Sequence, residues 1–113
     1  MFEKWFPKKP KDKYIKKFWK DFSGLADLFL NILQDNDAES DDYMWMESLV
    51  RRWLKMCCLD STVGYDFKFD TRREPPRLMF LHKNDGYLKQ VGERLAALYP
   101  QELTGKIDFV VAE

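Results

Sequence analysis

Few side chains in this sequence are suited to catalysis, and they are not grouped as catalysis requires. The single histidine, His82, and the adjacent cysteines Cys57 and Cys58 are the natural candidates for nucleophilic chemistry. Such chemistry needs the histidine exposed beside the nucleophile. We expect His82 to point from the end of a strand toward the apolar face, with a structural hydrogen bond. The sequence therefore predicts no catalytic residue and favours a protein that is not an enzyme.

The cysteine pair is also a poor metal or redox centre. Neighbouring cysteines cannot link distant parts of a chain, and a disulfide between them would strain the intervening peptide. We expect two free thiols near the end of a helix, at least one of them buried. A zinc site would need two further ligands, and the glycines never cluster into a phosphate-binding loop. We therefore predict neither a bound metal nor a cofactor.

Two carboxylates, Asp66 and Asp70, lie four residues apart in a predicted strand, with Lys68 between them. Residues at this spacing share a strand face but are too far apart along the strand to share a proton. They are typical of the solvated side of an edge strand.

The lysine-rich first twenty residues are the best candidate for a binding surface made by charge. They hold eight lysines and two acidic residues, a net charge of +6, although the whole chain has a net charge of zero. Lysines interleaved with aromatic residues occur both in nucleic-acid arms and in helices whose lysine stems simply cover the surface. Arginine, whose planar fork suits phosphate, is missing from the run. The candidate residues for an anionic surface are Trp5, Lys8, Lys9, Lys11, Lys13, Lys16, Lys17 and Lys20.

Length and composition indicate one folded domain. The chain has 113 residues, of which 45% are hydrophobic and 16% are aromatic. A chain of this size can bury a core without disulfides, and aromatic rings supply much of the packing area. No apolar run reaches the roughly 18 residues of a membrane span, and lysines and prolines stand where a signal peptide would be apolar. We expect a cytoplasmic protein.

The N-terminal half is predicted to be helical after a basic, aromatic arm at residues 1–10, with a single domain over 11–113. Apolar residues at three- and four-residue steps predict a helix over 12–33. Ser23 and Gly24 interrupt this stripe, so either one weakened helix or two shorter helices form; we favour the continuous helix. A second helix is expected over 41–58, capped by Ser40 or Asp41.

A β-hairpin follows, and its register can be predicted. If Tyr65 opposes His82, then Phe67 opposes Phe80 and Phe69 opposes Leu78, which gathers the large apolar side chains of one face. The same register places Asp70 opposite Arg77 as an ion pair. Residues 77–82 are apolar on both faces, which is typical of a central strand.

A third helix over 85–99, capped by Asn84 or Asp85, should lead to a final strand over 106–112. A strand, a helix and a strand with short joints make a crossover, which is right-handed almost without exception. The predicted fold class is α+β: two N-terminal helices followed by a ββαβ unit that forms a three-stranded mixed sheet.

The chain also resembles small uncharacterised bacterial α+β proteins. The resemblance covers most of the sequence, and it implies a fold but no catalytic residue, because its motifs are packing positions. They are FWKDF (18–22), GYDFKF (64–69), PPRLMFLH (75–82), YLKQVGERLAALYP (87–100) and KIDFVVAE (106–113).

The outer side of the predicted sheet suggests a function. Met79 and Leu81, with Val110 of the neighbouring strand, should form an apolar patch that a helix, a second copy or another protein must cover. We therefore expect a non-enzymatic protein-binding or adaptor domain that dimerises through the sheet face. The alternative is a binder of nucleic acid or of another anionic surface through the N-terminal lysines.

Overall fold

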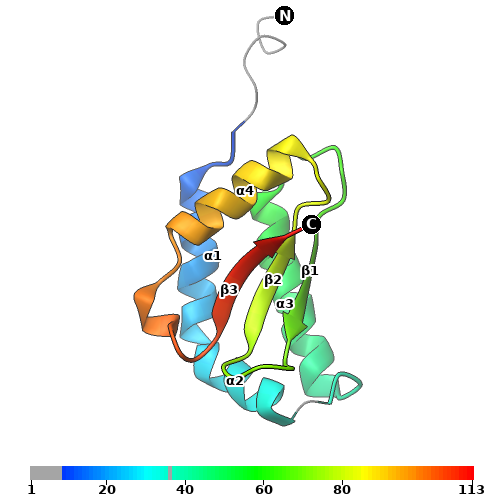
Figure 1. The fold of residues 1–113 in the computed structure, drawn as a ribbon, viewed down its shortest axis with the longest axis vertical. Coiled ribbons are helices and arrows are strands. Elements are labelled where there is room, and N and C mark those ends of the chain that lie inside the picture. The colour runs from blue at the N-terminus through cyan, green and yellow to red at the C-terminus, as the bar shows by residue number, and fades with distance from the viewer. Residues whose placement is uncertain (1–8, 36) are drawn as a thin grey trace, which may run out of the picture.

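The computed structural model describes residues 9–35 and 37–113. Within them, helices precede and follow a three-stranded mixed sheet, which confirms the α+β class (Figure 1). The elements in chain order are α1 (Asp12–Gly24), α2 (Ala26–Asp35), α3 (Asp41–Cys57), β1 (Asp66–Asp70), β2 (Arg77–Leu81), α4 (Gly86–Ala97), the short 3₁₀ helix η2 (Gln101–Leu103) and β3 (Asp108–Ala112).

The first predicted helix is in fact two helices, so three helices rather than two precede the strands. Helix α1 ends at Gly24, and Leu25 leaves helical geometry, with φ of −116° and ψ of 10°. A glycine costs a helix interior up to about 1 kcal/mol relative to alanine, so continuing through it gains little. The break keeps both apolar stripes in the core, since the Phe22 and Phe29 rings lie 5.4 Å apart. The expectation of one continuous helix was wrong.

The next two helices begin at predicted caps. The Ser40 hydroxyl accepts a hydrogen bond from the backbone N–H of Tyr43 at 3.1 Å. The Asp85 carboxylate accepts one from the backbone N–H of Leu88 at 3.0 Å. Each cap satisfies a donor that has no partner inside its own helix.

The sheet has the predicted order and register. Strand β2 is central, antiparallel to β1 and parallel to β3. Phe67 opposes Phe80 and Phe69 opposes Leu78, as predicted. Strand β1 begins at Asp66, and just before it the hydroxyl of Tyr65 donates a hydrogen bond to the backbone carbonyl of Arg51 in α3 at 2.8 Å.

The helices lie on one face of the sheet (Figure 1). Helix α1 packs on β3, where the rings of Trp19 and Phe109 are 5.2 Å apart, and α3 packs on β1, where Tyr43 and Phe69 are 6.4 Å apart. Helix α4 joins them, since Gly92 lies against the side chain of Val111. Phe109, Val111 and Phe69 all point to the same side of the sheet. In the described part of the chain, the opposite face carries no helix.

Trp19 joins the helical layer to the sheet. Its side chain is buried, and its indole N–H donates to the backbone carbonyl of Leu95 in α4 at 2.9 Å. Its ring makes edge-on contacts with Tyr99 and Phe109, at centroid distances of 5.4 and 5.2 Å. Trp19 of α1 therefore contacts three other parts of the chain, namely α4, the segment that follows α4, and β3.

The close approach of α4 to β3 yields a prediction for Gly92. A Cβ at this position would lie 2.7 Å from Cγ1 and 3.1 Å from Cγ2 of Val111. We expect Gly92→Ala to lower the free energy of unfolding by about 1–3 kcal/mol, the usual cost of overpacking. Urea unfolding monitored by circular dichroism measures the change.

Two further variants control this prediction. Gly86→Ala adds a Cβ in open space in the same helix and should not carry the cost. In a Val111→Ala background, Gly92→Ala should become neutral or stabilising, because alanine is the better helix former by up to about 1 kcal/mol. A Gly92→Ala variant more stable than the wild-type chain would contradict the packing described.

Candidate functional site: the open face of the sheet

The face of the sheet that the helices leave uncovered is called here the open face. Side chains alternate along a strand, so each five-residue strand contributes three of them to this face. They are Asp66, Lys68 and Asp70 of β1, Arg77, Met79 and Leu81 of β2, and Asp108, Val110 and Ala112 of β3.

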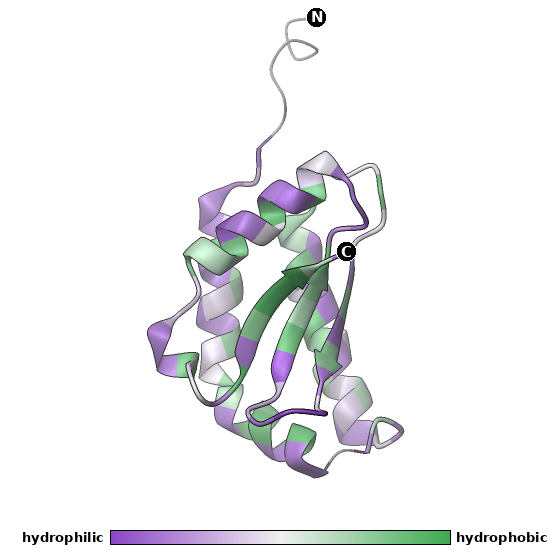
Figure 2. Cartoon of the chain, viewed as in Figure 1, coloured by the Kyte–Doolittle hydropathy of each residue, from purple (hydrophilic) through white to green (hydrophobic). Residues whose placement is uncertain are grey.

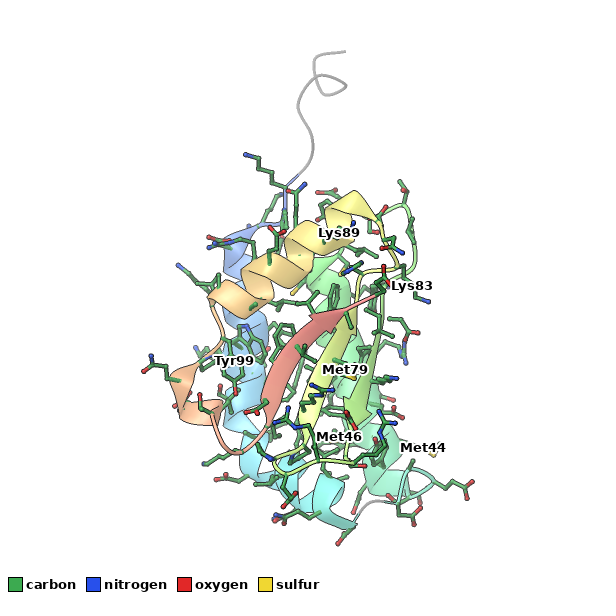
Figure 3. All side chains as sticks on the ribbon, in the orientation of Figure 1. Met44, Met46, Met79, Lys83, Lys89 and Tyr99 are labelled. Atoms are coloured by element: carbon green, nitrogen blue, oxygen red, sulfur yellow. The ribbon has the colours of Figure 1, made fainter. Side chains whose placement is uncertain are left out.

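Four apolar side chains form one continuous part of the open face. Met79 opposes Val110, and Leu81 opposes Ala112, across the parallel pair of β2 and β3. Each is partly exposed. Figure 2 shows this end of the two strands in green, and Figure 3 places Met79 on β2. The structure thus brings the predicted residues Met79, Leu81 and Val110 together and adds Ala112.

A row of charges borders this apolar part at the end where β2 begins. Asp70 opposes Arg77, and Arg77 opposes Asp108. The Nε of Arg77 lies 3.2 Å from one carboxylate oxygen of Asp70, which confirms the predicted ion pair, and the Nε of Arg72 lies 3.2 Å from the other. Arg73 pairs with Asp108 at 3.4 Å. The sequence predicted the Asp70–Arg77 pair but not the two arginines of the loop.

Asp70 is the one buried charged residue in the part of the chain that the structure describes, with 7% of its surface exposed. Its pKa falls from 3.8 to about 2, chiefly because its carboxylate accepts hydrogen bonds from the backbone and the side chain of Arg72. Burial acts in the opposite direction, and Arg77 lowers the pKa further. Asp70 is therefore ionised at neutral pH, which suits a fixed charge and not a proton donor.

The candidates for nucleophilic chemistry, the two cysteines and the histidine, lie outside the open face and are not arranged as a nucleophile and its base. Cys57 and Cys58 are free and buried, as predicted, and burial raises the pKa of each thiol to about 12. The thiolate is the nucleophilic form, so neither is activated at neutral pH. His82 follows β2, and its Nδ1 accepts a hydrogen bond from the backbone N–H of Asn84 at 2.9 Å. This is a structural hydrogen bond of the kind expected for it.

Asp66 stands apart from Asp70 on the open face. Its carboxylate accepts a hydrogen bond from the backbone N–H of Phe67 at 2.8 Å and lies 3.7 Å from the Nζ of Lys83. The two carboxylates therefore have different partners and act separately.

The predicted basic surface is only partly described. Trp5 and Lys8, like most of the predicted arm at residues 1–10, lie outside the described residues. Six lysines are described and exposed: Lys9, Lys11, Lys13, Lys16, Lys17 and Lys20. The last four lie on one side of α1, because residues three and four apart are neighbours on a helix. Helix α1 packs on the covered side of the sheet, so these lysines and the open face are separate surfaces.

A groove between α1 and α3 was not predicted from the sequence. It holds a cavity of about 150 Å³, lined by Tyr14, Lys17, Phe18, Asp21, Trp53 and Met56. Phe18 belongs to the buried core, and Trp53 is partly buried and packs against it. The signal that could have pointed to the groove is Met56, an apolar residue that leaves the stripe and is exposed.

Among the described residues, no group of three or more histidine, cysteine or acidic side chains could hold a metal ion. Nor does this part of the chain contain a helix whose length and apolar character would let it cross a membrane.

Comparison with protein-family models, with curated proteins and with solved structures finds no match to this chain. The resemblance to bacterial α+β proteins therefore stays a prediction, and the function must be inferred from the surfaces themselves.

The ion pairs made by the buried carboxylate of Asp70 predict a pH-dependent contribution to stability. A group whose pKa is lowered by folding stabilises the folded chain above its ordinary pKa of 3.8, and this contribution is lost as the pH falls toward about 2. We expect Asp70→Asn to lower the urea midpoint at pH 7. The deficit should shrink between about pH 4 and pH 2, where the wild-type carboxylate also becomes neutral.

Glu102→Gln is the matched control, since Glu102 is exposed in η2. It should leave the midpoint nearly unchanged at each pH. An Asp70→Asn deficit that stays constant from neutral to acid pH would show that the charge of Asp70 does not stabilise the fold.

Proposed function

We propose that this chain is a non-enzymatic protein-binding or adaptor domain and that the open face is its docking surface. The observation that carries the proposal is the apolar part of this face, Met79, Leu81, Val110 and Ala112, which no helix covers in the described residues. Parallel strands, such as the β2–β3 pair that carries these side chains, are normally covered on both faces of the sheet. An apolar face bordered by charges is typical of a surface that another protein covers.

The state of the reactive side chains supports a binding role over catalysis. Cys57 and Cys58 are buried with raised pKa values, His82 is engaged by the backbone of its own turn, and Asp70 is held as a carboxylate. The state of each of these side chains is accounted for without a catalytic step, which favours a binding role.

Photochemical cross-linking tests the docking surface. A photoreactive phenylalanine analogue at position 79 should form a covalent adduct with a protein partner in an extract of the source cells. The same analogue at Glu102, exposed in η2, should not. Adducts are identified by mass spectrometry of the cross-linked peptides.

Val110→Lys places a charge beside position 79 and should abolish the adduct, because a buried unpaired charge opposes docking. The proposal fails if position 79 yields no protein adduct, or if its adducts match those from position 102 and persist in the Val110→Lys chain.

A second candidate function rests on the lysines of α1. Lys13, Lys16, Lys17 and Lys20 share one exposed side of the helix, where they would meet an anionic surface together. Lys17 is also paired with Asp21 at 3.0 Å, which offsets part of this charge. The basic side favours nucleic acid or another polyanion as the alternative partner.

This alternative predicts steep salt dependence. Affinity for a fluorescent single-stranded DNA should fall as salt rises, and each lysine that contacts phosphate adds about 0.7 to the slope of log affinity against log salt concentration. Lys16→Gln should reduce the slope by that amount, whereas Lys89→Gln in α4 should leave it unchanged. Undetectable binding at low salt, or equal slopes for both variants, would exclude this function for α1.

A further inference from the structure

We propose that the partner on the open face is a second copy of this chain. The open faces of the two copies would pack against each other about a two-fold axis. This axis runs parallel to the strands, in the plane of contact between the two sheets, and lies over the midline between β2 and β3. This inference rests on the proposed function, because it uses the same surface, and it names the partner and the register.

The geometry follows from the pairing of β2 and β3. These strands are parallel, with Arg77 opposite Asp108, Met79 opposite Val110 and Leu81 opposite Ala112. A rotation of 180° about an axis midway between them keeps the strand direction and exchanges their positions. Strand β2 of one copy then lies over β3 of the other, within the roughly 30° range of aligned sheet packing. Each residue that lies beside its register partner within one sheet therefore also faces that partner in the second copy.

Charge complementarity favours this axis. Arg77 of each copy faces Asp108 of the other, so two opposite-charge contacts form. An axis along β2 would instead place Arg77 over Arg77 of the second copy. An axis that lies in the plane of contact and crosses the strands at Met79 would place Lys68 over Lys68 of the second copy. Like charges across an interface are unfavourable, so both alternatives are disfavoured.

The sizes of the apolar side chains agree with the same axis. Leu81 faces Ala112 of the second copy, a large side chain over a small one, and Met79 faces Val110. Packed sheets bring their inner side chains together by such interdigitation. In this arrangement Asp66 and Lys68 of β1 fall outside the contact and form a polar rim, as interfaces commonly have.

The size of the face sets the expected strength. The two strands that make the contact, β2 and β3 with five residues each, cover about 10 by 17 Å, or about 170 Å², from the spacing of strands and the rise per residue. This is well below the roughly 800 Å² per partner of a standard stable interface. We therefore expect a weak dimer that forms and separates readily.

Two size-exchanged variants test the register. Leu81→Ala leaves a small side chain facing Ala112 of the second copy, and Ala112→Leu forces a second leucine against Leu81. Each variant alone should dimerise at least tenfold more weakly than the wild-type chain. In an equimolar mixture, the leucine introduced at position 112 of one variant faces the alanine introduced at position 81 of the other. The unchanged Leu81 and Ala112 also face each other, so both contacts regain a large and a small partner.

Sedimentation velocity over a concentration series measures the dimerisation of every sample, and circular dichroism verifies that each variant is folded. We expect the mixture to dimerise with an affinity close to that of the wild-type chain. Lys20→Glu, the same charge reversal in α1 and away from the open face, should dimerise like the wild-type chain. A wild-type chain that stays monomeric at millimolar concentration would overturn the inference, as would a mixture no better than its components.

These outcomes are separate from those of the proposed function. If the purified chain is monomeric while position 79 captures a different protein in the cell extract, the second-copy inference fails and the binding function stands. If position 79 captures no protein and the chain is monomeric, both fail.

Discussion

The packing of Trp19 fixes the side of the sheet on which the helices lie. This buried side chain contacts Phe109 of β3 and Tyr99, and its N–H donates to the carbonyl of Leu95 in α4. An indole N–H is costly to bury without a partner, so the hydrogen bond and the ring contacts must form together. With α3 packed against β1 on the same side, the helices form one layer. The uncovered opposite face, and every functional inference drawn from it, depends on this one-sided packing.

The open face combines two features that act differently. Its charged row is held in place from within the chain, since Arg72 and Arg77 both bind Asp70. Its apolar part, centred on Met79 and Val110, is partly exposed and has no such internal partner in the described residues. Fixed charges next to an apolar surface favour one orientation of a partner over others, because charge pairs set register while apolar contact supplies affinity. The face is therefore suited to specific but weak association.

The elements of the sheet could be predicted from the sequence because alternation is a strong local signal. A one-residue shift of β1 against β2 would turn Phe67 and Phe69 into solvent, so their register is determined by burial. The break at Gly24 could not be predicted, since the two alternatives differ by only about 1 kcal/mol in local preference and tertiary packing decides. The arginines around Asp70 and Asp108 depend on the path of the loop between β1 and β2. The patch residues Met79, Leu81 and Val110 were predicted, but their complementarity appears only with the β2–β3 register.

Methionine methyl NMR with a water-soluble paramagnetic chelate tests most directly whether the open face is uncovered in the single chain. At high dilution, the Met79 methyl should relax faster when the chelate is added, as should the exposed Met44 methyl, whereas the fully buried Met46 methyl should not respond. A Met79 methyl as protected as that of Met46 at the lowest concentration would show that the chain covers this face itself and would contradict the account.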